Sequence, residues 1–145
     1  MLIREAAQKD LIPLLELYTH LHSNPMPEPN EKLQQLWDGI LNDPNHHILV
    51  GEREGTLVCS CVIVVVPNLT HGQRPYALIE NVITHPAHRK KGYASGAIAA
   101  SIELAQKEGC YKIMLLTGSK EESTLRFYER AGFNSHDKTA FIKWL

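Results

Sequence analysis

The stretch from residue 77 to residue 108 constrains the fold of this chain more than any other part. An apolar run over residues 77–84 is broken at Pro86, and a basic turn containing Gly92 then leads into a pattern with helical spacing. A helix entered in this way exposes its first backbone N–H groups, which have no intrahelical partner. The helix dipole adds partial positive charge at the same point. We therefore expect an anion-binding site at this junction.

Three basic residues and one glycine define the turn. Arg89, Lys90 and Lys91 supply full positive charges, and Gly92 allows the backbone to come close to a bulky phosphate. The spacing Arg-x-x-Gly-x-Ala, which ends at Ala94, favours a pyrophosphate as the anion, and coenzyme A as its carrier. The alternative is an ordinary solvated start of a helix.

The composition excludes several classes of protein. With 145 residues, 43% of them hydrophobic, the chain is expected to form one globular domain over residues 1–145. A formal net charge of −1 argues against binding to nucleic acid. The longest apolar run, residues 57–66, is too short to span a bilayer, and the first residues lack the apolar core of a signal peptide. We therefore expect a cytoplasmic protein that binds neither nucleic acid nor a membrane.

The three cysteines predict neither a disulfide framework nor a metal site. Their number is odd. Cys59 and Cys61 are two residues apart in a strand-like run, so their side chains are expected on one face of a sheet as buried apolar groups. No second pair of Cys or His residues with ligand spacing accompanies them, so we expect no metal.

Hydrophobic periodicity predicts the remaining elements. Helices are expected over residues 9–22, 31–41, 92–108 and 123–131, and strands over residues 2–5, 47–52, 57–66, 76–84, 112–117, 133 and 139–144. This order predicts an α/β fold (α+β in some schemes) with a mixed, mostly antiparallel central sheet of six to seven strands and about four flanking helices. A parallel crossover is expected to pass through the helix that begins near Gly92.

Three segments resemble the GNAT superfamily of acyl-CoA N-acyltransferases: residues 80–86 (ENVITHP), 89–94 (RKKGYA) and 126–133 (RFYERAGF). The last two, separated by a strand, carry most of the resemblance, which covers nearly the whole chain in element order. It implies a GNAT-like fold. It also implies an N-acetyltransferase that moves the acetyl group of acetyl-CoA to a primary amine by direct transfer in a ternary complex.

In this family, the strand before the turn and the strand after the long helix splay apart, and the pantetheine arm of acetyl-CoA lies in the gap. The resemblance implies that the backbone of Val82 and Thr84 pairs with this arm like an added strand, and that an N–H near Val82 binds the oxyanion. The residues expected to contact the co-substrate are Val82, Ile83, Thr84, Arg89, Lys90, Lys91, Gly92, Tyr93, Ala94, Ser95, Thr124 and Phe127. Family members often hold the arm with an Asn early in the last motif; here Ser123 or Thr124 is expected to replace it.

Two residues are candidates for acid and base chemistry. Tyr128 matches the family's general acid, whose hydroxyl protonates the departing thiolate; the alternative is a core aromatic residue beside Phe127. Glu80 is the candidate base, acting through water, and partial burial would make it a better base near neutral pH. The alternative for Glu80 is a sheet-edge carboxylate paired with Lys or Arg. His85 and His88 could relay protons, although structural roles are favoured for both.

The acceptor amine is less constrained. Residues 80–82 and 109–113 are similar to segments of glucosamine-phosphate acetyltransferases, and the layout is similar to that of aminoalkylphosphonate acetyltransferases. Both acceptors are small anionic amines, which implies a second basic patch, with Arg74 and His71 as candidates. A solvated loop explains these two residues equally well. The loop over residues 25–29 is either a plain connector or the rim of the substrate site.

Other readings stay open. One is a non-catalytic acyl-CoA-binding regulatory module, and another is an acetyltransferase that acts on a protein amine. A nucleotide-phosphate-binding protein is disfavoured because the sequence has no Gly-x-x-x-x-Gly-Lys-Ser/Thr run. The apolar C-terminal strand that contains Trp144 would suit the contact of a homodimer.

Overall fold

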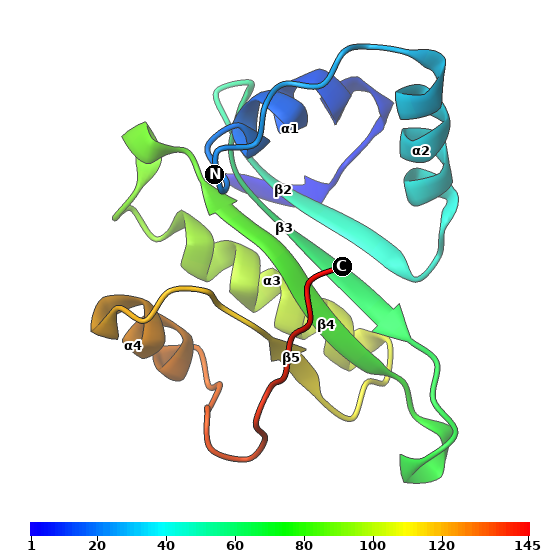
Figure 1. Ribbon diagram of the computed structural model, residues 1–145, viewed down its shortest axis with the longest axis vertical. Coiled ribbons are helices and arrows are strands. Elements are labelled where there is room, and N and C mark those ends of the chain that lie inside the picture. Colours follow the sequence, from blue (N-terminus) through cyan, green and yellow to red (C-terminus); the bar gives the residue numbers. More distant parts are fainter.

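One five-stranded sheet, in the order β1-β2-β3-β4-β5, runs through the computed structural model, which describes all 145 residues (Figure 1). The strands are β1 (Leu2–Glu5), β2 (His46–Arg53), β3 (Thr56–Val66), β4 (Tyr76–Thr84) and β5 (Ile113–Leu115). Neighbouring strands are antiparallel from β1 to β4, and β4 and β5 are parallel. The mixed, mostly antiparallel sheet that the sequence predicts is therefore confirmed.

Four α-helices accompany the sheet, as predicted. They are α1 (Leu11–Tyr18), α2 (Glu31–Asn42), α3 (Tyr93–Lys107) and α4 (Glu122–Arg130), and short 3-10 helices cover Gln8–Asp10, His71–Gln73 and Pro86–His88. Asn30 caps α2 by accepting a hydrogen bond from the Leu33 N–H at 2.8 Å. The predicted parallel crossover is confirmed, because α3 connects β4 to β5.

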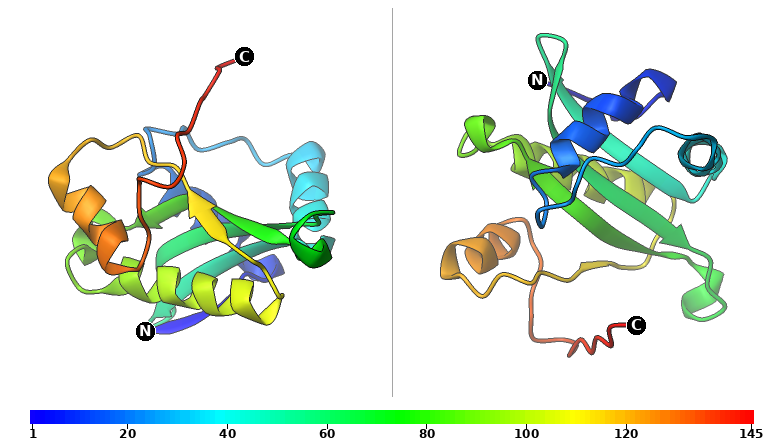
Figure 2. Two further views of the ribbon diagram at one scale, coloured as in Figure 1. Left: turned by 90° about the horizontal axis from the view of Figure 1, so that it is seen from below. Right: turned by 45° about the horizontal axis from the view of Figure 1, so that its top comes forward.

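The helices form layers on both faces of the sheet (Figure 2). Leu14 of α1 and Trp37 of α2 are buried against Val50 on one face, while Ala97 and Ile98 of α3 are buried on the other. Strand β3 lies between these layers, and in its β-branched run Val62, Ile63 and Val65 are buried while Val64 and Val66 are partly buried. None of the helices combines the length and apolarity needed to cross a bilayer.

The two inner cysteines behave as predicted. Cys59 and Cys61 are buried and free, and both thiols lie on the α3 side, where they contact the carbonyls of Tyr93 and Ala97 at 3.7 Å. They act as small apolar groups packed beneath the helix.

The two predicted C-terminal strands are absent, so the sheet has five strands rather than six to seven. Phe133 follows α4 in an irregular segment, and residues 134–145 contain neither helix nor strand. A strand forms only against a partner strand, and this segment leads away from the sheet (Figure 2). Its apolar side chains stay exposed: Phe141, Ile142, Trp144 and Leu145.

Candidate active site

Strand β4 has a free edge next to the predicted anion-binding turn. It pairs with β5 only at Ala77, Leu78 and Ile79, whereas its pairing with β3 continues to Thr84. Residues 80–84 therefore have a strand on one side and none on the other. The chain after β5 diverges from β4 towards α4 (Figure 1). This is the splayed arrangement that the resemblance implies.

A β-bulge interrupts β4 where this free edge begins. Val62 pairs with Glu80 and Ser60 with Ile83, so β4 has one more residue than β3 across this interval. Asn81 adopts a left-handed φ of 51°, which few non-glycine residues do. Bulges of this kind reorient the backbone and are frequent beside active sites.

The bulge changes which backbone groups point towards the free edge. Before it, the Ala77 N–H donates to the Lys112 carbonyl at 3.0 Å, on the β5 side. After it, the His85 N–H donates to the Val58 carbonyl at 2.9 Å, on the β3 side. The N–H and C=O groups of successive residues point to opposite sides of a strand. Because those of His85 point to β3, the backbone groups of Thr84 and Val82 point towards the free edge. These are the two residues that the resemblance implies would pair with the pantetheine arm.

The turn that follows β4 is built to leave backbone N–H groups free. His85 Nδ1 accepts the Ala87 N–H at 3.2 Å and starts the short helix Pro86–His88. Lys90 and Gly92 have φ values of 60° and 78°, so Gly92 supplies a left-handed conformation that suits glycine. No side chain caps α3, and the first bond of this helix runs from the Gly96 N–H to the Gly92 carbonyl.

Consequently, the N–H groups of Tyr93, Ala94 and Ser95 have no partner within the chain. The four residues before them, 89–92, are exposed and include three cationic side chains. Free N–H groups, a helix dipole and exposed cations together fit a diphosphate. The residues present thus fit the diphosphate of coenzyme A.

Tyr128 lies in the cluster that joins α4 to the sheet. Its ring makes edge-to-face contacts with Phe127 at 5.0 Å and Phe133 at 6.3 Å between ring centroids. Val82 and Tyr93 pack against the same buried cluster. The Tyr128 hydroxyl makes no hydrogen bond within the chain, and burial raises the pKa of this phenol. The group is therefore a free, protonated donor at neutral pH.

Thr124 is less available than the sequence predicts. Its Oγ1 accepts a hydrogen bond from Ser119 Oγ at 3.1 Å, and the same Ser119 oxygen accepts the Glu121 N–H at 3.2 Å. The hydroxyl thus stabilises the start of α4. Phe127 is half-buried one turn further along.

Glu80 lies beside the bulge but is not partly buried as expected. It is exposed, and it forms no ion pair, so the paired alternative is not found either. Its partner across the sheet, Val62, packs with Leu14 and Trp37, which places Glu80 on the same face as α1 and α2.

Three imidazoles meet at the end of β4. The rings of His20 and His85 are 4.8 Å apart, and those of His85 and His88 are 5.6 Å apart. Burial lowers the pKa of His85, and the neighbouring His20, His88 and Arg89 lower it further. These contacts place His85 in a structural role at the start of the turn. No cluster of three or more His, Cys, Asp or Glu side chains is arranged to hold a metal ion.

A pocket of about 260 Å³ opens beside the bulge. Its lining comes from α1, the segment after α1, and β4: Leu15, Tyr18, Leu21, Asn24, Pro25, Pro27 and Asn81. The loop over residues 25–29 is therefore the rim of a pocket. Periodicity alone marks Tyr18 as one more core residue of α1, so the sequence gives no sign of its place in this lining.

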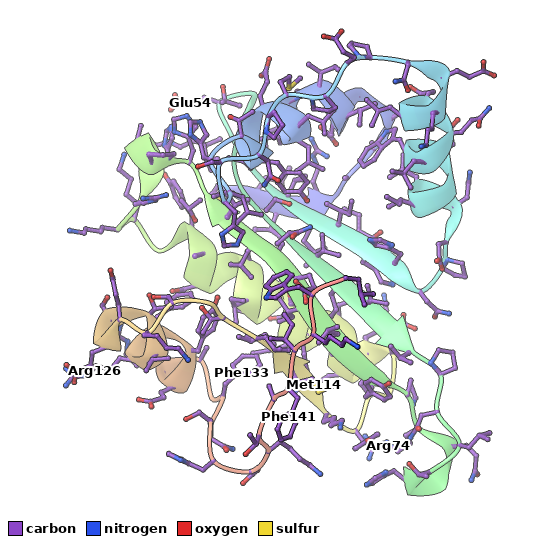
Figure 3. The ribbon with its side chains drawn as sticks, viewed as in Figure 1. Glu54, Arg74, Met114, Arg126, Phe133 and Phe141 are labelled. Atoms are coloured by element: carbon purple, nitrogen blue, oxygen red, sulfur yellow. The ribbon has the colours of Figure 1, made fainter.

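The predicted second basic patch is not at this pocket. Arg74 precedes β4 and donates to the carbonyls of Gly109 and Cys110 at 3.1 and 3.0 Å. His71 stacks on Tyr111 at 3.9 Å. Figure 3 shows Arg74 at the end of the sheet opposite the hairpin turn at Glu54. These contacts belong to the C-terminal end of α3.

Comparisons with known proteins match nearly the whole chain. Residues 11–133 match the sequence model described as the acetyltransferase (GNAT) family. A protein from Agrobacterium tumefaciens strain C58, proposed to be an acetyltransferase, is 37% identical with a TM-score of 0.91, and the match covers 99% of this chain and 100% of that one.

Two further solved structures share the fold. A transcriptional regulator from Bacillus halodurans C-125 is 27% identical with a TM-score of 0.87, and 99% of each chain is covered. Glucosamine-6-phosphate N-acetyltransferase from Arabidopsis thaliana is 20% identical with a TM-score of 0.86, and the match covers 99% of this chain and 97% of that one.

Proposed function

This chain belongs to the GNAT acetyltransferase family, and we propose that it transfers the acetyl group of acetyl-CoA directly to the primary amine of a small molecule. The observation that carries the proposal is the bulge at Asn81, which turns the backbone of Val82 towards the free edge of β4. Tyr128 packs in the same cluster as Val82. A donor for the reacting carbonyl and a proton donor for the leaving group thus pack against one buried cluster.

The turn over residues 89–95 holds the diphosphate in this proposal. The unpaired N–H groups of Tyr93, Ala94 and Ser95 bind its oxygens, and Arg89 and Lys90 add charge from the exposed side of the turn. The backbone of Val82 and Thr84 pairs with the amide groups of the pantetheine arm, as an added strand would. The reactive end of the arm then lies beside the bulge.

Each catalytic group has one role. The co-substrate supplies an activated acetyl thioester, and the amine attacks it only when neutral. Glu80, which is exposed beside the bulge on the face of the sheet that α1 and α2 cover, takes the proton of the amine through water. The Val82 N–H stabilises the charge that develops on the carbonyl oxygen. Tyr128 donates its proton to the departing sulfur, which its raised pKa permits at neutral pH.

A thiol-release assay with acetyl-CoA tests the proposal across amino sugars and their phosphates, aminophosphonates, polyamines, alkylamines and peptides. We expect release with at least one small amine. Tyr128→Phe should then lower kcat by at least about 10- to 100-fold while leaving the KM for acetyl-CoA unchanged. Tyr111→Phe, which lies just before β5 and packs beside Tyr76 at the start of β4, is the matched control and should retain full activity.

The rival function is that of a regulatory acyl-CoA-binding module. The likeness to a transcriptional regulator is the observation that supports this alternative. That module would bind acetyl-CoA and release no thiol with any amine, and Tyr128→Phe would leave its function unchanged. Release of thiol only with peptides would instead indicate a protein amine as acceptor.

We also propose that the chain forms a homodimer through its C-terminal segment. Phe141 and Trp144 are 92% and 85% exposed, and each aromatic side chain can bury about 150–250 Å² in a contact. A second copy of the chain would cover this apolar segment.

A further inference from the structure

We infer that the neutral imidazole of His85 holds the turn over residues 89–95 in the form that binds coenzyme A, so that acid weakens this binding. His85 is then a positioning residue, because it acts through the backbone of the short helix Pro86–His88 rather than by contact with the ligand. The inference rests on the diphosphate site of the proposed function and adds to it a pH dependence that the protein itself supplies.

The ring of His85 caps the short helix in one protonation state only. Its Nδ1 accepts the Ala87 N–H at 3.2 Å, much as the side chain of Asn30 accepts an N–H at the start of α2. A ring nitrogen accepts a hydrogen bond only while it carries no proton, and a protonated imidazole has N–H groups at both positions. The contact therefore requires the neutral ring with its proton on Nε2.

The cap lies where β4 becomes the turn. On the strand side, the His85 N–H donates to the Val58 carbonyl at 2.9 Å. On the turn side, the His85 carbonyl accepts the His88 N–H at 2.8 Å, and the next bond, from the Arg89 N–H to the Pro86 carbonyl, is longer at 3.4 Å. Loss of the cap would thus loosen the short segment that leads to Arg89 and to the free N–H groups of α3.

A row of packed rings connects His85 to the start of α3. The His85 ring lies 4.8 Å from that of His20 and 5.6 Å from that of His88, and the His88 ring lies 6.2 Å from that of Tyr93. Tyr93 is the first residue of α3, and its hydroxyl accepts a hydrogen bond from Arg53 at 2.6 Å. A protonated His85 ring that turns away from Ala87 would therefore disturb this row as well.

The surroundings of His85 favour its neutral form. Charged or titratable groups approach the ring from two sides: Glu16 and His20 from α1 and the segment after it, and His88, Arg89 and Lys91 from the turn. Residues 55–57, which line the same pocket from the hairpin of β2 and β3, are uncharged.

The direction of the pH effect follows from these contacts. Burial lowers the pKa of His85, and His20, His88 and Arg89 lower it further, so the folded chain binds this proton less readily than the unfolded chain. The cap is therefore complete above the ordinary histidine pKa of about 6.5 and is lost as the pH falls below it.

The test measures the equilibrium binding of dephospho-coenzyme A by calorimetry between pH 5 and pH 7.5 at constant ionic strength. This probe keeps the diphosphate and the pantetheine arm but lacks the phosphate monoester, whose own second pKa of about 6 would obscure the result. For the unmodified chain, we expect the Kd to rise about threefold to tenfold as the pH falls, as the loss of one cap predicts.

Two variants of His85 separate the cap from the mere presence of the ring. His85→Asn keeps an acceptor that does not titrate, so its Kd should match that of the unmodified chain at pH 7.5 and change less than about twofold in acid. His85→Ala has no acceptor, so its Kd should already be about threefold to tenfold higher at pH 7.5 and should stay there.

A neighbour and a remote residue complete the set. His20→Gln removes a group that lowers the pKa of His85, so the rise in Kd should begin at a higher pH. His136→Gln, in the exposed C-terminal segment, is the matched control and should leave the whole profile unchanged.

Three results would overturn the inference while the diphosphate site stands: a Kd that is independent of pH in the unmodified chain, a Kd that falls in acid, or an equal rise in His85→Asn. Failure of dephospho-coenzyme A to bind at any pH would refute the diphosphate site and the inference together. Binding with the predicted pH profile, but without thiol release from any amine, would refute the transferase and support the inference.

Discussion

Asn81 adopts a backbone conformation that side chains with a branched Cβ rarely tolerate, and the direction of the Val82 backbone depends on it. The strained backbone of Asn81 therefore sets the direction of the backbone groups along the free edge of β4. Its side chain also lines the pocket beside the bulge, so one position affects both the direction of the backbone and the lining of the pocket. Substitutions that separate these two effects are informative.

Asn81→Gly should keep the bulge, because glycine adopts the left-handed region freely. Asn81→Val should oppose the bulge and lower the free energy of unfolding by about 1–3 kcal/mol relative to Asn81→Gly. Urea denaturation measures this difference, and kcat should fall further in the valine variant. Equal unfolding midpoints for the two variants would contradict a strained bulge at this position.

At the scale of elements, the sequence predicts helices, strands and turns best where neighbouring residues alone determine the backbone conformation. The apolar run, Pro86 and Gly92 together predict β4, the turn and α3, because each of these signals acts on the backbone beside it. The bulge at Asn81 carries no such signal, since it arises from register against β3. The last two predicted strands fail for a related reason: their pattern describes a segment that needs a partner strand, and residues 133–145 pair with neither β5 nor any other strand.

If the turn over residues 89–95 binds the diphosphate, changes in this turn should affect the KM for acetyl-CoA and not the KM for the amine. Replacing Arg89 and Lys90 with Gln should raise the KM for acetyl-CoA about tenfold or more, because two charge-assisted contacts to the diphosphate are lost. The KM for the amine should not change. Lys107→Gln, at the opposite end of α3, is the matched control and should behave like the unmodified chain. A rise in the KM for the amine alone would contradict this assignment.

Asp10 joins three elements and makes stability depend on pH. Its carboxylate accepts two hydrogen bonds from Arg4 of β1, at 2.6 and 2.9 Å, and one from the Ala7 N–H at 2.8 Å, while Arg4 also binds Glu52 of β2. The hydrogen bonds from Arg4 hold the pKa of Asp10 below its ordinary value. Because the folded state then binds this proton less readily than the unfolded chain, Asp10 stabilises the fold above about pH 4.

The stabilising contribution of Asp10 should disappear as the pH falls below about 4. Asp10→Asn should lower the free energy of unfolding by about 1–3 kcal/mol at pH 7 and flatten its decline in acid. Asp137→Asn, in the exposed C-terminal segment, should do neither. Chemical denaturation between pH 3 and pH 7 measures both curves. Parallel curves for Asp10→Asn and the unmodified chain would refute the role of the ion pair.

At the scale of the whole molecule, the core and the site occupy different parts of one sheet. The buried residues of β2 and β3 make the rigid centre, and the candidate active site lies where β4 loses its second neighbour. The apolar side chains of the C-terminal segment, by contrast, are exposed and add nothing to the buried core. The isolated chain thus leaves one apolar segment without a partner.

Deleting residues 139–145 should therefore abolish self-association while the domain stays folded. Sedimentation equilibrium should give twice the chain mass for the full chain and the chain mass for the truncated one. Phe141→Ser with Trp144→Ser should act like the deletion, and Lys143→Gln should not. A full chain that stays monomeric at high concentration would contradict the proposed dimer.

The central claim is that the turn over residues 89–95 binds the diphosphate of coenzyme A and that the free edge of β4 guides its arm towards Tyr128. A crystal structure grown with coenzyme A tests this most directly. The account predicts diphosphate oxygens within hydrogen-bond distance of the N–H groups of residues 93–95, and the arm paired with Val82 and Thr84. Coenzyme A bound at another surface, or no bound ligand at saturating concentration, would contradict it.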